Sequence, residues 1–237
     1  MASSLYCLKF VYFVSFLSTF PHIAIPSFSS VQPLCHDYER SYLLQFKESF
    51  VIINNNKSIS SDPWAYPKVA SWTLEGNSSD CCSWDGVECD EFTGHVIGLD
   101  IHSSCLHGSI NSTSSLFNLV HLQRLNLAEN HFNHSQIPSK VSNLSKLTYL
   151  NLSYSVFSSK IPLEFSQLYQ MSSLDLSFNH LETKKPSLGH LVENLTLLEK
   201  LDLSWVSIIS IVPNILANLS SLRPFVYVTA NCMGNFQ

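Results

Sequence analysis

The stretch that decides the fold is Leu122-Gln-Arg-Leu-Asn-Leu-Ala-Glu-Asn-His-Phe132, which has leucines at its first, fourth and sixth positions and an asparagine at its ninth. The same spacing returns with its first position at Leu147, Met171 and Leu198, and a further copy begins at Leu222. The intervals between these five positions are 25, 24, 27 and 24 residues. Such regular spacing indicates an internal structural repeat rather than an ordinary globular core.

A period of this length with a Leu-x-x-Leu-x-Leu pattern is typical of leucine-rich repeats. Each Leu-x-Leu predicts a short strand with inward leucines, whose apolar face is covered only by the neighbouring repeats. Stacked repeats of this kind predict an α/β solenoid, a right-handed superhelix with a parallel sheet on its concave side. An earlier copy at Leu99 and Ile101 extends the pattern, so we expect about six repeats in residues 93–237, the last one incomplete.

Only some copies of the repeat have asparagine at the ninth position. Asparagine stands there at Asn130 and Asn179, whereas the other copies carry Ser104, Ser155 and Val206. Because this side chain normally bonds the turn backbone of adjacent repeats, we expect an incomplete ladder.

Residues 1–30 contain no acidic residue, one Lys9 and an apolar run from Val11 to Leu17. This layout predicts a secretory signal peptide. A retained membrane anchor is the less favoured alternative, because prolines at positions 21 and 26 interrupt the run and a spanning helix needs about 20 apolar residues. We expect an extracellular location or the outer side of the plasma membrane, with no transmembrane helix in this chain beyond the signal peptide.

The composition excludes several classes of function. The 237 residues are 45% hydrophobic and 13% charged, which excludes a disordered chain, and the net charge of −5 argues against a nucleic-acid partner. Neither a nucleophile-elbow motif nor a glycine-rich phosphate loop is present, so we expect no enzyme and no cofactor. His131 and His134 have metal-like spacing but no nearby carboxylate, so we predict no metal site there.

Residues 31–92 are expected to cover the open face of the first repeat, and we call this segment the cap. An apolar stripe predicts a helix from Tyr38 to Phe50 with Asp37 as its N-cap. The cap contains four cysteines, which are Cys35, Cys81, Cys82 and Cys89. Because Cys81 and Cys82 are adjacent and the chain is expected to be exported, disulfides are favoured over a zinc site. Three pairings remain open. Cys105 and Cys232 are left over, about 24 Å apart along the predicted sheet and too distant to bond.

Three further segments, Trp64–Trp72, Asp80–Asp90 and Thr93–Asp100, closely resemble plant leucine-rich-repeat receptor-like proteins, in the subgroup with tomato disease-resistance receptors. The resemblance implies the pairings Cys35–Cys81 and Cys82–Cys89. It also implies a longer ectodomain, one transmembrane helix, a short tail, no kinase, and a partner receptor kinase. Because this chain ends within its repeats, we interpret it as a truncated N-terminal part of such an ectodomain.

Two functions follow from this interpretation. The first is an extracellular ligand-recognition module, in plant immune or developmental signalling, that binds a peptide or protein ligand. The alternative is a secreted inhibitor similar to the polygalacturonase inhibitors, which share this kind of cap and repeat length. A downstream apolar segment of about 20 residues followed by basic residues would favour the receptor.

The candidate ligand surface follows from the strand geometry. The second residue after each Leu-x-Leu is expected on the concave side, where the column holds Ser103, Glu129, Tyr154, Phe178 and Trp205. Three successive aromatics at a strand spacing of ~4.8 Å predict an exposed strip with a binding role. The flanking polar contacts are predicted to be Tyr149, Asp175, Lys200 and Asp202. The alternative is that these aromatics only stack and stiffen the sheet.

N-glycosylation is predicted at eight Asn-x-Ser/Thr sequences, which begin at Asn56, Asn77, Asn111, Asn133, Asn143, Asn151, Asn194 and Asn218. Asn151 lies between two inward leucines, so a glycan there would project from the concave sheet. The sites at positions 143, 194 and 218 are expected on outer turns.

Overall fold

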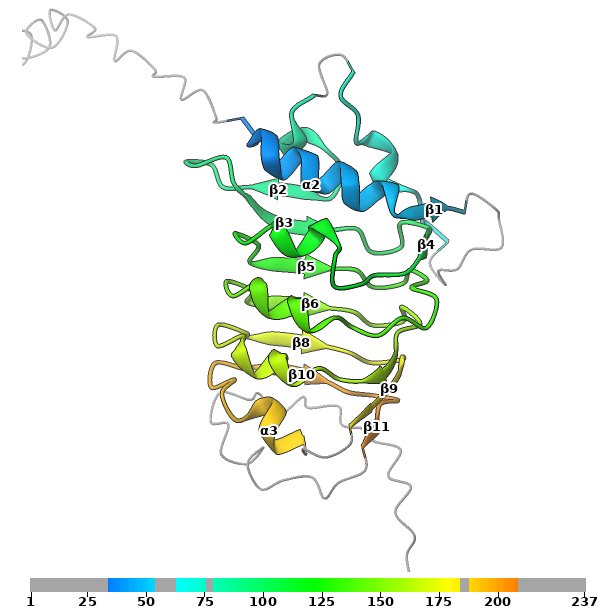
Figure 1. The fold of residues 1–237 in the computed structure, drawn as a ribbon, viewed down its shortest axis with the longest axis vertical. Coiled ribbons are helices and arrows are strands. Elements are labelled where there is room, and N and C mark those ends of the chain that lie inside the picture. Colours follow the sequence, from blue (N-terminus) through cyan, green and yellow to red (C-terminus); the bar gives the residue numbers. More distant parts are fainter. Residues whose placement is uncertain (1–33, 54–62, 76–78, 184–187, 209–237) are drawn as a thin grey trace, which may run out of the picture. The chain divides into compact units, whose positions relative to one another are not determined.

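The computed structural model describes residues 34–53, 63–75, 79–183 and 188–208 (Figure 1). The predicted signal peptide, Asn56, Asn77, Asn218, Cys232 and the final repeat lie outside these residues. All described residues belong to one compact unit, Gln32–Gln237. None of the helices among them is long and apolar enough to cross a membrane.

The main sheet has six strands in the order β10-β8-β6-β5-β3-β2, which are Lys200–Asp202, Ser173–Asp175, Tyr149–Asn151, Arg124–Asn126, Val96–Asp100 and Val87–Cys89. All neighbours are parallel except β2, which runs antiparallel to β3. One leucine per strand is aligned across the five parallel strands and is at most 2% exposed; the set is Leu99, Leu125, Leu150, Leu174 and Leu201. The predicted leucine-rich-repeat solenoid is confirmed.

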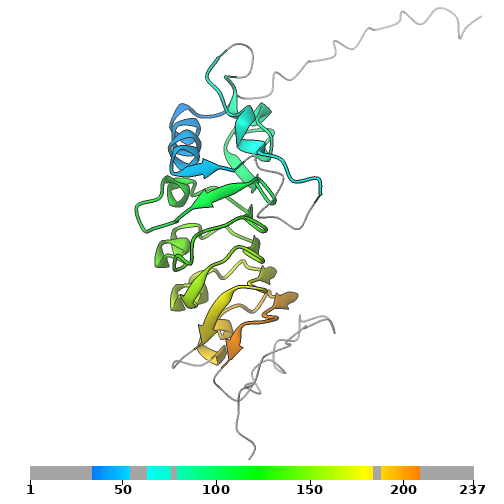
Figure 2. The same ribbon diagram turned by 90° about the vertical axis from the view of Figure 1, so that its right-hand side faces the viewer.

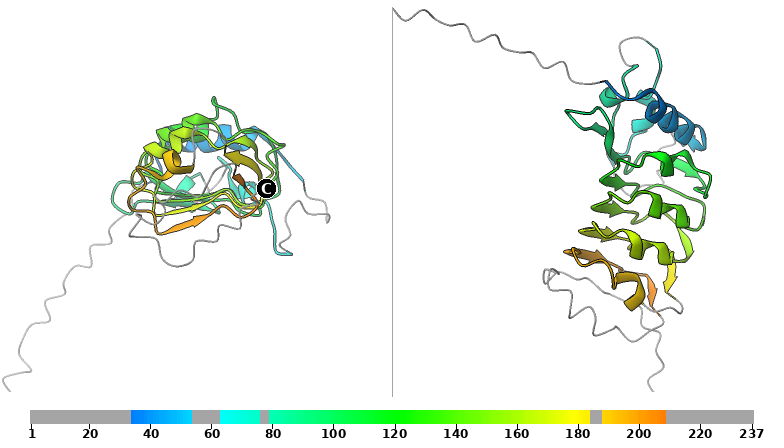
Figure 3. Two further views of the ribbon diagram at one scale, coloured as in Figure 1. Left: turned by 90° about the horizontal axis from the view of Figure 1, so that it is seen from below. Right: turned by 60° about the vertical axis from the view of Figure 1, so that its left-hand side comes forward.

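The opposite side of each repeat is helical. It carries the short 3₁₀ helices η5 (Ser115–Asn118), η6 (Ser139–Asn143) and η7 (Leu163–Gln167), followed by α3 (Leu188–Val192). Seen along the stack, these helices lie across from the main sheet, with the core between the two layers (Figure 3).

Two smaller sheets complete the repeats. In the first, β7 (Ser158–Lys160), β9 (His180–Thr183) and β11 (Ser207–Ile208) pair in parallel, beyond the carboxyl ends of the main strands. In the second, β1 (Phe50–Ile52) pairs antiparallel with β4 (Leu106–Gly108) and joins the cap to the first repeat. Viewed from the side, the repeats form successive layers (Figure 2). The repeat pattern of the sequence predicted neither of these sheets.

A row of phenylalanines runs through the core from the cap into the repeats. The ring centroids of Phe46 and Phe50 lie 4.9 Å apart, those of Phe50 and Phe132 lie 5.7 Å apart, and those of Phe132 and Phe157 lie 4.8 Å apart. Aromatic rings at these separations add to the stability gained from burial. The row therefore makes the cap and the first repeats one continuous core.

The buried asparagines connect neighbouring repeats, as predicted. The Oδ1 atom of Asn179 accepts hydrogen bonds from the backbone N–H groups of Ser155 and Phe157, at 3.2 and 3.0 Å. Its Nδ2 donates to the carbonyls of Leu152, Leu176 and Ser177. At the equivalent position Ser155 only donates its hydroxyl, to Leu127 and Ser153.

The cap begins with helix α2 (Asp37–Glu48), followed by the 3₁₀ helices η2 (Lys68–Ser71) and η4 (Cys81–Ser83). The predicted N-cap is wrong: the helix already includes Asp37, whose carboxylate instead pairs with Arg40 at 2.7 Å. The side chains of Trp72 and Trp84 are buried and stack with centroids 5.7 Å apart.

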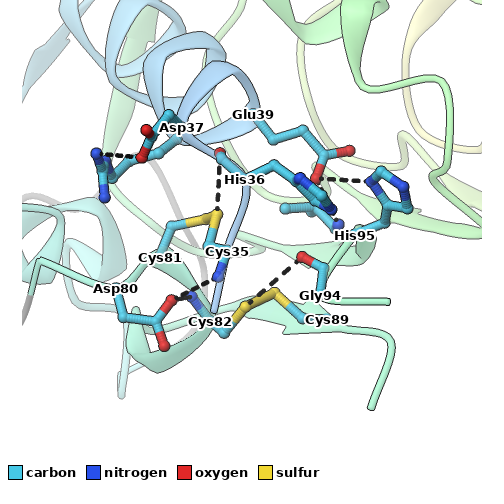
Figure 4. Close-up of a disulfide and its surroundings, with 12 residues drawn as sticks. Cys35, His36, Asp37, Glu39, Asp80, Cys81, Cys82, Cys89, Gly94 and His95 are labelled. Carbon is cyan, nitrogen blue, oxygen red and sulfur yellow. Dashed lines mark hydrogen bonds and ion pairs between the residues drawn. A yellow bond between two sulfur atoms is a disulfide. The ribbon is translucent and has the colours of Figure 1, made fainter. Parts of the chain in front are cut away.

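Both disulfides implied by the family resemblance are present, Cys35–Cys81 and Cys82–Cys89 (Figure 4). Asp80 holds one cysteine of each disulfide in place, because its Oδ1 accepts hydrogen bonds from the backbone N–H groups of Cys35 and Cys82 at 3.0 and 3.2 Å. Cys105 is buried and unpaired among the described residues.

Replacing the buried amide should destabilise the stack strongly. We expect Asn179→Ala to lower the free energy of unfolding by about 3 kcal/mol or more, because several buried backbone groups lose their partners. The control Asn126→Ala should cost less than about 1 kcal/mol, since Asn126 is half-buried and accepts one bond, from the N–H of Ala128. Denaturant unfolding measures both, and equal losses would contradict the proposed role of the amide.

Candidate ligand-binding surface

The residue two positions after each Leu-x-Leu adopts the left-handed backbone conformation. Its φ is 50° at Ser103, 55° at Glu129, 50° at Tyr154, 52° at Phe178 and 65° at Trp205. Non-glycine residues rarely adopt such angles, so the surroundings must hold this turn in place. The next repeat does so: the N–H of Tyr154 donates to Ser177 at 3.1 Å, and that of Phe178 donates to Ser204 at 2.9 Å.

Three of these turn residues form the predicted aromatic strip, which we define as Tyr154, Phe178 and Trp205. Their side chains are exposed by 47%, 38% and 62%. The first two rings stack nearly parallel, with centroids 4.1 Å apart, and the third follows at 6.0 Å. The strip is therefore continuous across three repeats.

The strip does not lie on the strands of the concave face, as the sequence analysis placed it, but in the turns just beyond their ends. There it lines a groove of about 750 Å³ together with residues of the second sheet, which include Ser159, His180, Glu182 and Ser207. The physical reason is the left-handed turn, which redirects the chain from the main sheet toward β7, β9 and β11. The strip thus occupies the margin between the two sheets.

The four flanking residues of the predicted ligand site do lie on the strands of the main sheet. The predicted site residues therefore form two groups, one on these strands and one in the turns that follow them. Tyr149 begins β6, Lys200 begins β10, and Asp175 and Asp202 end their strands. Tyr149 also lines a separate groove of about 390 Å³ near the cap, together with Gly98, Asn126 and the ion pair of Arg124 with Glu88.

The two aspartates have a structural task that sequence reasoning missed. Oδ1 of Asp175 accepts from the N–H of Ser177 at 2.9 Å and from its hydroxyl at 2.6 Å, and Oδ1 of Asp202 accepts from the N–H of Ser204 at 2.8 Å. Every parallel strand of the main sheet ends with such a residue, and the full column is Asp100, Asn126, Asn151, Asp175 and Asp202. The recurrence of Asp or Asn at this repeat position was the available signal.

The electrostatic surroundings of the strip are negative. Burial raises the pKa of Asp175, the charge of Asp202 raises it further, and the hydrogen bonds from Ser177 oppose the rise. The pKa of Tyr154 is also raised, first by burial and then by the charges of Glu129, Asp175 and Asp202. Three acidic side chains thus lie near Tyr154, at one end of the strip.

The raised pKa of Asp175 gives a pH-dependent prediction. Because the folded state holds this proton more tightly than the unfolded state, ionisation costs stability as the pH rises above the unfolded value of about 3.9. We expect Asp175→Asn to raise the melting temperature at pH 7, while the difference from the parent chain shrinks as the pH falls toward 4.

The matched control is Asp100→Asn, which should act with the opposite sign. Burial raises the pKa of Asp100, but hydrogen bonds from His102 and the charge of Lys68 outweigh it, so the pKa is lowered overall. The melting temperature of this variant at pH 7 should be lower than that of the parent chain, and this difference should also shrink as the pH falls. Melting curves at several pH values decide the matter, and shifts of the same sign in both variants would contradict this electrostatic account.

Comparison with known proteins supports the fold and places the chain among its relatives. The leucine rich repeat N-terminal domain matches residues 36–90, and the leucine rich repeat itself matches residues 146–168. Among solved structures, a plant ice-binding protein matches with a TM-score of 0.59 and 29% identity, over 79% of this chain and 54% of that chain. The BIR3–SERK2 complex from Arabidopsis thaliana matches with a TM-score of 0.58 and 27% identity, over 75% of this chain and 86% of that chain.

The sequence relatives are plant receptor-like proteins. Receptor-like protein 6 of Arabidopsis thaliana is 41% identical over 88% of this chain and 22% of its own length. Receptor-like protein 9DC1 of Solanum pimpinellifolium is 38% identical over 92% of this chain and 25% of its own length. The chain thus spans about a quarter or less of these relatives. The chain therefore carries leucine-rich repeats with their N-terminal domain, and over most of its length it is similar to plant receptor-like proteins.

Proposed function

We propose that this chain is a non-catalytic extracellular recognition module that binds a peptide or protein ligand, in plant immune or developmental signalling. The observation that carries the proposal is the aromatic strip of Tyr154, Phe178 and Trp205 beside its groove. In this proposal residues 1–30 are the signal peptide, residues 31–92 are the cap and residues 93–237 are the repeats.

Exposed aromatic side chains that form a continuous patch are unusual on a soluble protein and mark interaction sites. Aromatic residues also supply much of the binding energy at protein interfaces, because they bury a large area with few rotatable bonds. Here the left-handed turns fix the backbone of all three residues before a ligand arrives. A preorganised surface loses less conformational entropy on binding.

The groove suits an extended ligand that runs across the repeats. Each repeat would add one aromatic contact, while the polar side chains of Ser159, His180 and Ser207 line the same groove and would contact the ligand's polar groups. The negative charges near Tyr154 favour a ligand with a basic group at that end of the strip.

A second protein partner is proposed by analogy. One similar structure is a complex of two proteins, BIR3 and SERK2. If the whole protein is anchored in the plasma membrane, we expect it to act together with a partner receptor kinase.

The strip can be tested with artificial peptide ligands. A displayed random peptide library is selected on the secreted, disulfide-intact chain, and the affinities of enriched peptides are then measured by calorimetry. Phe178→Ser and Trp205→Ser should each weaken binding more than tenfold, as expected for anchors buried by a ligand.

Matched controls are Tyr169→Ser and Phe92→Ser, whose side chains are exposed by 59% and 88% but lie outside the groove. Both should bind like the parent chain. Equal loss in strip and control variants, or unchanged binding in the strip variants with normal secretion, would place recognition elsewhere.

The glycosylation sites provide a separate test of the surface. Asn111, Asn133, Asn143 and Asn194 are exposed, whereas Asn151 is half-buried and lies on β6 of the concave sheet. We expect glycopeptide mass spectrometry to find the exposed sites occupied and Asn151 unmodified, because Asn151 is half-buried on a strand and its Oδ1 accepts two hydrogen bonds from Ser153. A glycan on Asn151 would shield that part of the concave sheet and restrict binding to the margin.

A further inference from the structure

Three potential metal ligands converge where the cap helix meets the first repeats. Glu39 comes from α2, His95 directly precedes β3, and His121 lies shortly before β5. A carboxylate oxygen and one ring nitrogen from each histidine lie within 4.8 Å of one another. Figure 4 shows the Glu39 carboxylate directed at the ring of His95.

The carboxylate of Glu39 is buried and only half satisfied. Its side chain is 1% exposed, and Oε2 accepts from the N–H of Val96 at 3.0 Å and lies 3.4 Å from Nδ1 of His95. The other oxygen, Oε1, is buried with no hydrogen-bond partner. Because a buried carboxylate oxygen without a partner is costly, this atom points to a ligand that completes the site.

The histidines form a stack at the edge of this carboxylate. The ring centroids of His36 and His95 lie 4.1 Å apart, and those of His95 and His121 lie 3.7 Å apart. Three other polar groups contact the stack: the carbonyl of Thr93, 3.0 Å from Nε2 of His36, the hydroxyl of Tyr38, 3.3 Å from Nδ1 of His95, and Nζ of Lys146, 3.1 Å from Nδ1 of His121.

We propose that Glu39, His95 and His121 bind a divalent transition-metal ion of the zinc type. Two imidazoles and one carboxylate form a donor set suited to zinc, whereas magnesium and calcium prefer oxygen ligands alone. Binding would bring the three donor atoms, which now lie within 4.8 Å of one another, to about 2.0–2.2 Å from the ion. The nitrogen lone pairs of two parallel imidazole rings do not converge on one point, so the ring of His95 or of His121 must rotate out of the stack to bind the ion. If Nδ1 of His121 is the ligand atom, the ammonium group of Lys146 must also move away from it.

The proposed ion would join three separate parts of the chain: the cap helix, the entry to β3 and the entry to β5. Its binding would therefore stabilise the docking of the cap on the repeats, independently of any ligand at the aromatic strip. Since His95 and His121 are only partly buried, a fourth coordination position stays open to water.

The test uses the secreted, disulfide-intact full chain without an affinity tag that binds metals. Calorimetric titration with zinc chloride should give one bound ion per chain. At a hundredfold excess over Kd the melting temperature should rise by on the order of 5 °C, whereas magnesium chloride should leave it unchanged.

The variants that locate the ion are His121→Gln and His131→Gln. His131 is a matched control because it is also partly buried, stacks on another histidine, His107, at 4.6 Å, and has a pKa lowered by burial. His121→Gln should lose at least tenfold in zinc affinity and most of the thermal shift, and His131→Gln should keep both. Cobalt(II) added in place of zinc should give a visible absorption band in the parent and in His131→Gln only.

The proposal is overturned if zinc neither binds nor raises the melting temperature of the parent chain. It is also overturned if His121→Gln binds zinc as well as the parent, or if His131→Gln loses the ion instead. His95→Gln is a second variant with the same expected loss of zinc binding. It decides the question if the His121→Gln protein is not secreted.

Discussion

The stacking of one repeat on the next is the interaction on which the rest of the structure depends. A three-residue strand buries its leucine only because equivalent leucines lie directly above and below, as Leu125, Leu150 and Leu174 do in register. No single repeat has a core of its own, so each layer is stable only when both of its faces are covered. The cap provides this cover at one end; its two disulfides link segments within the cap, and the row of phenylalanines joins it to the first repeats.

The same stacking also creates the candidate ligand surface. Main-chain bonds between neighbouring repeats hold the turn after each strand in the left-handed conformation, and in three of these turns the residue is a well-exposed aromatic. Where that side chain is Tyr154, Phe178 or Trp205, the result is an ordered row of exposed rings. The surface is thus a direct product of the scaffold, and only its side-chain chemistry is free to vary.

The repeat period was sufficient to predict the strands, the buried leucines and the inter-repeat role of Asn179, because a fixed spacing determines which positions face inward. Other features depend on contacts between distant segments and could not be predicted from the pattern. The second sheet arises only when neighbouring turns pair, so the strip was placed on the concave face rather than at its margin. Asp37 matched an N-cap by residue type, but it pairs with Arg40 within the helix. The burial of Glu39 could not be predicted either, because its carboxylate contacts the backbone of Val96, which lies 57 residues further along the sequence.

The loss of the asparagine at Val206 has a mechanical consequence. Asn130 and Asn179 each bond the main chain of the preceding repeat, and Ser155 still reaches the carbonyl of Leu127, but a valine side chain can form no such link. Between β8 and β10 the strands pair through their main chains, with Leu174 aligned with Leu201, but Val206 adds no amide link. Under tension along the stack, this seam should open before the layers that keep an amide. Phe178 and Trp205 lie on opposite sides of this seam, so a molecule that contacts both rings would link the two layers that the amide does not join.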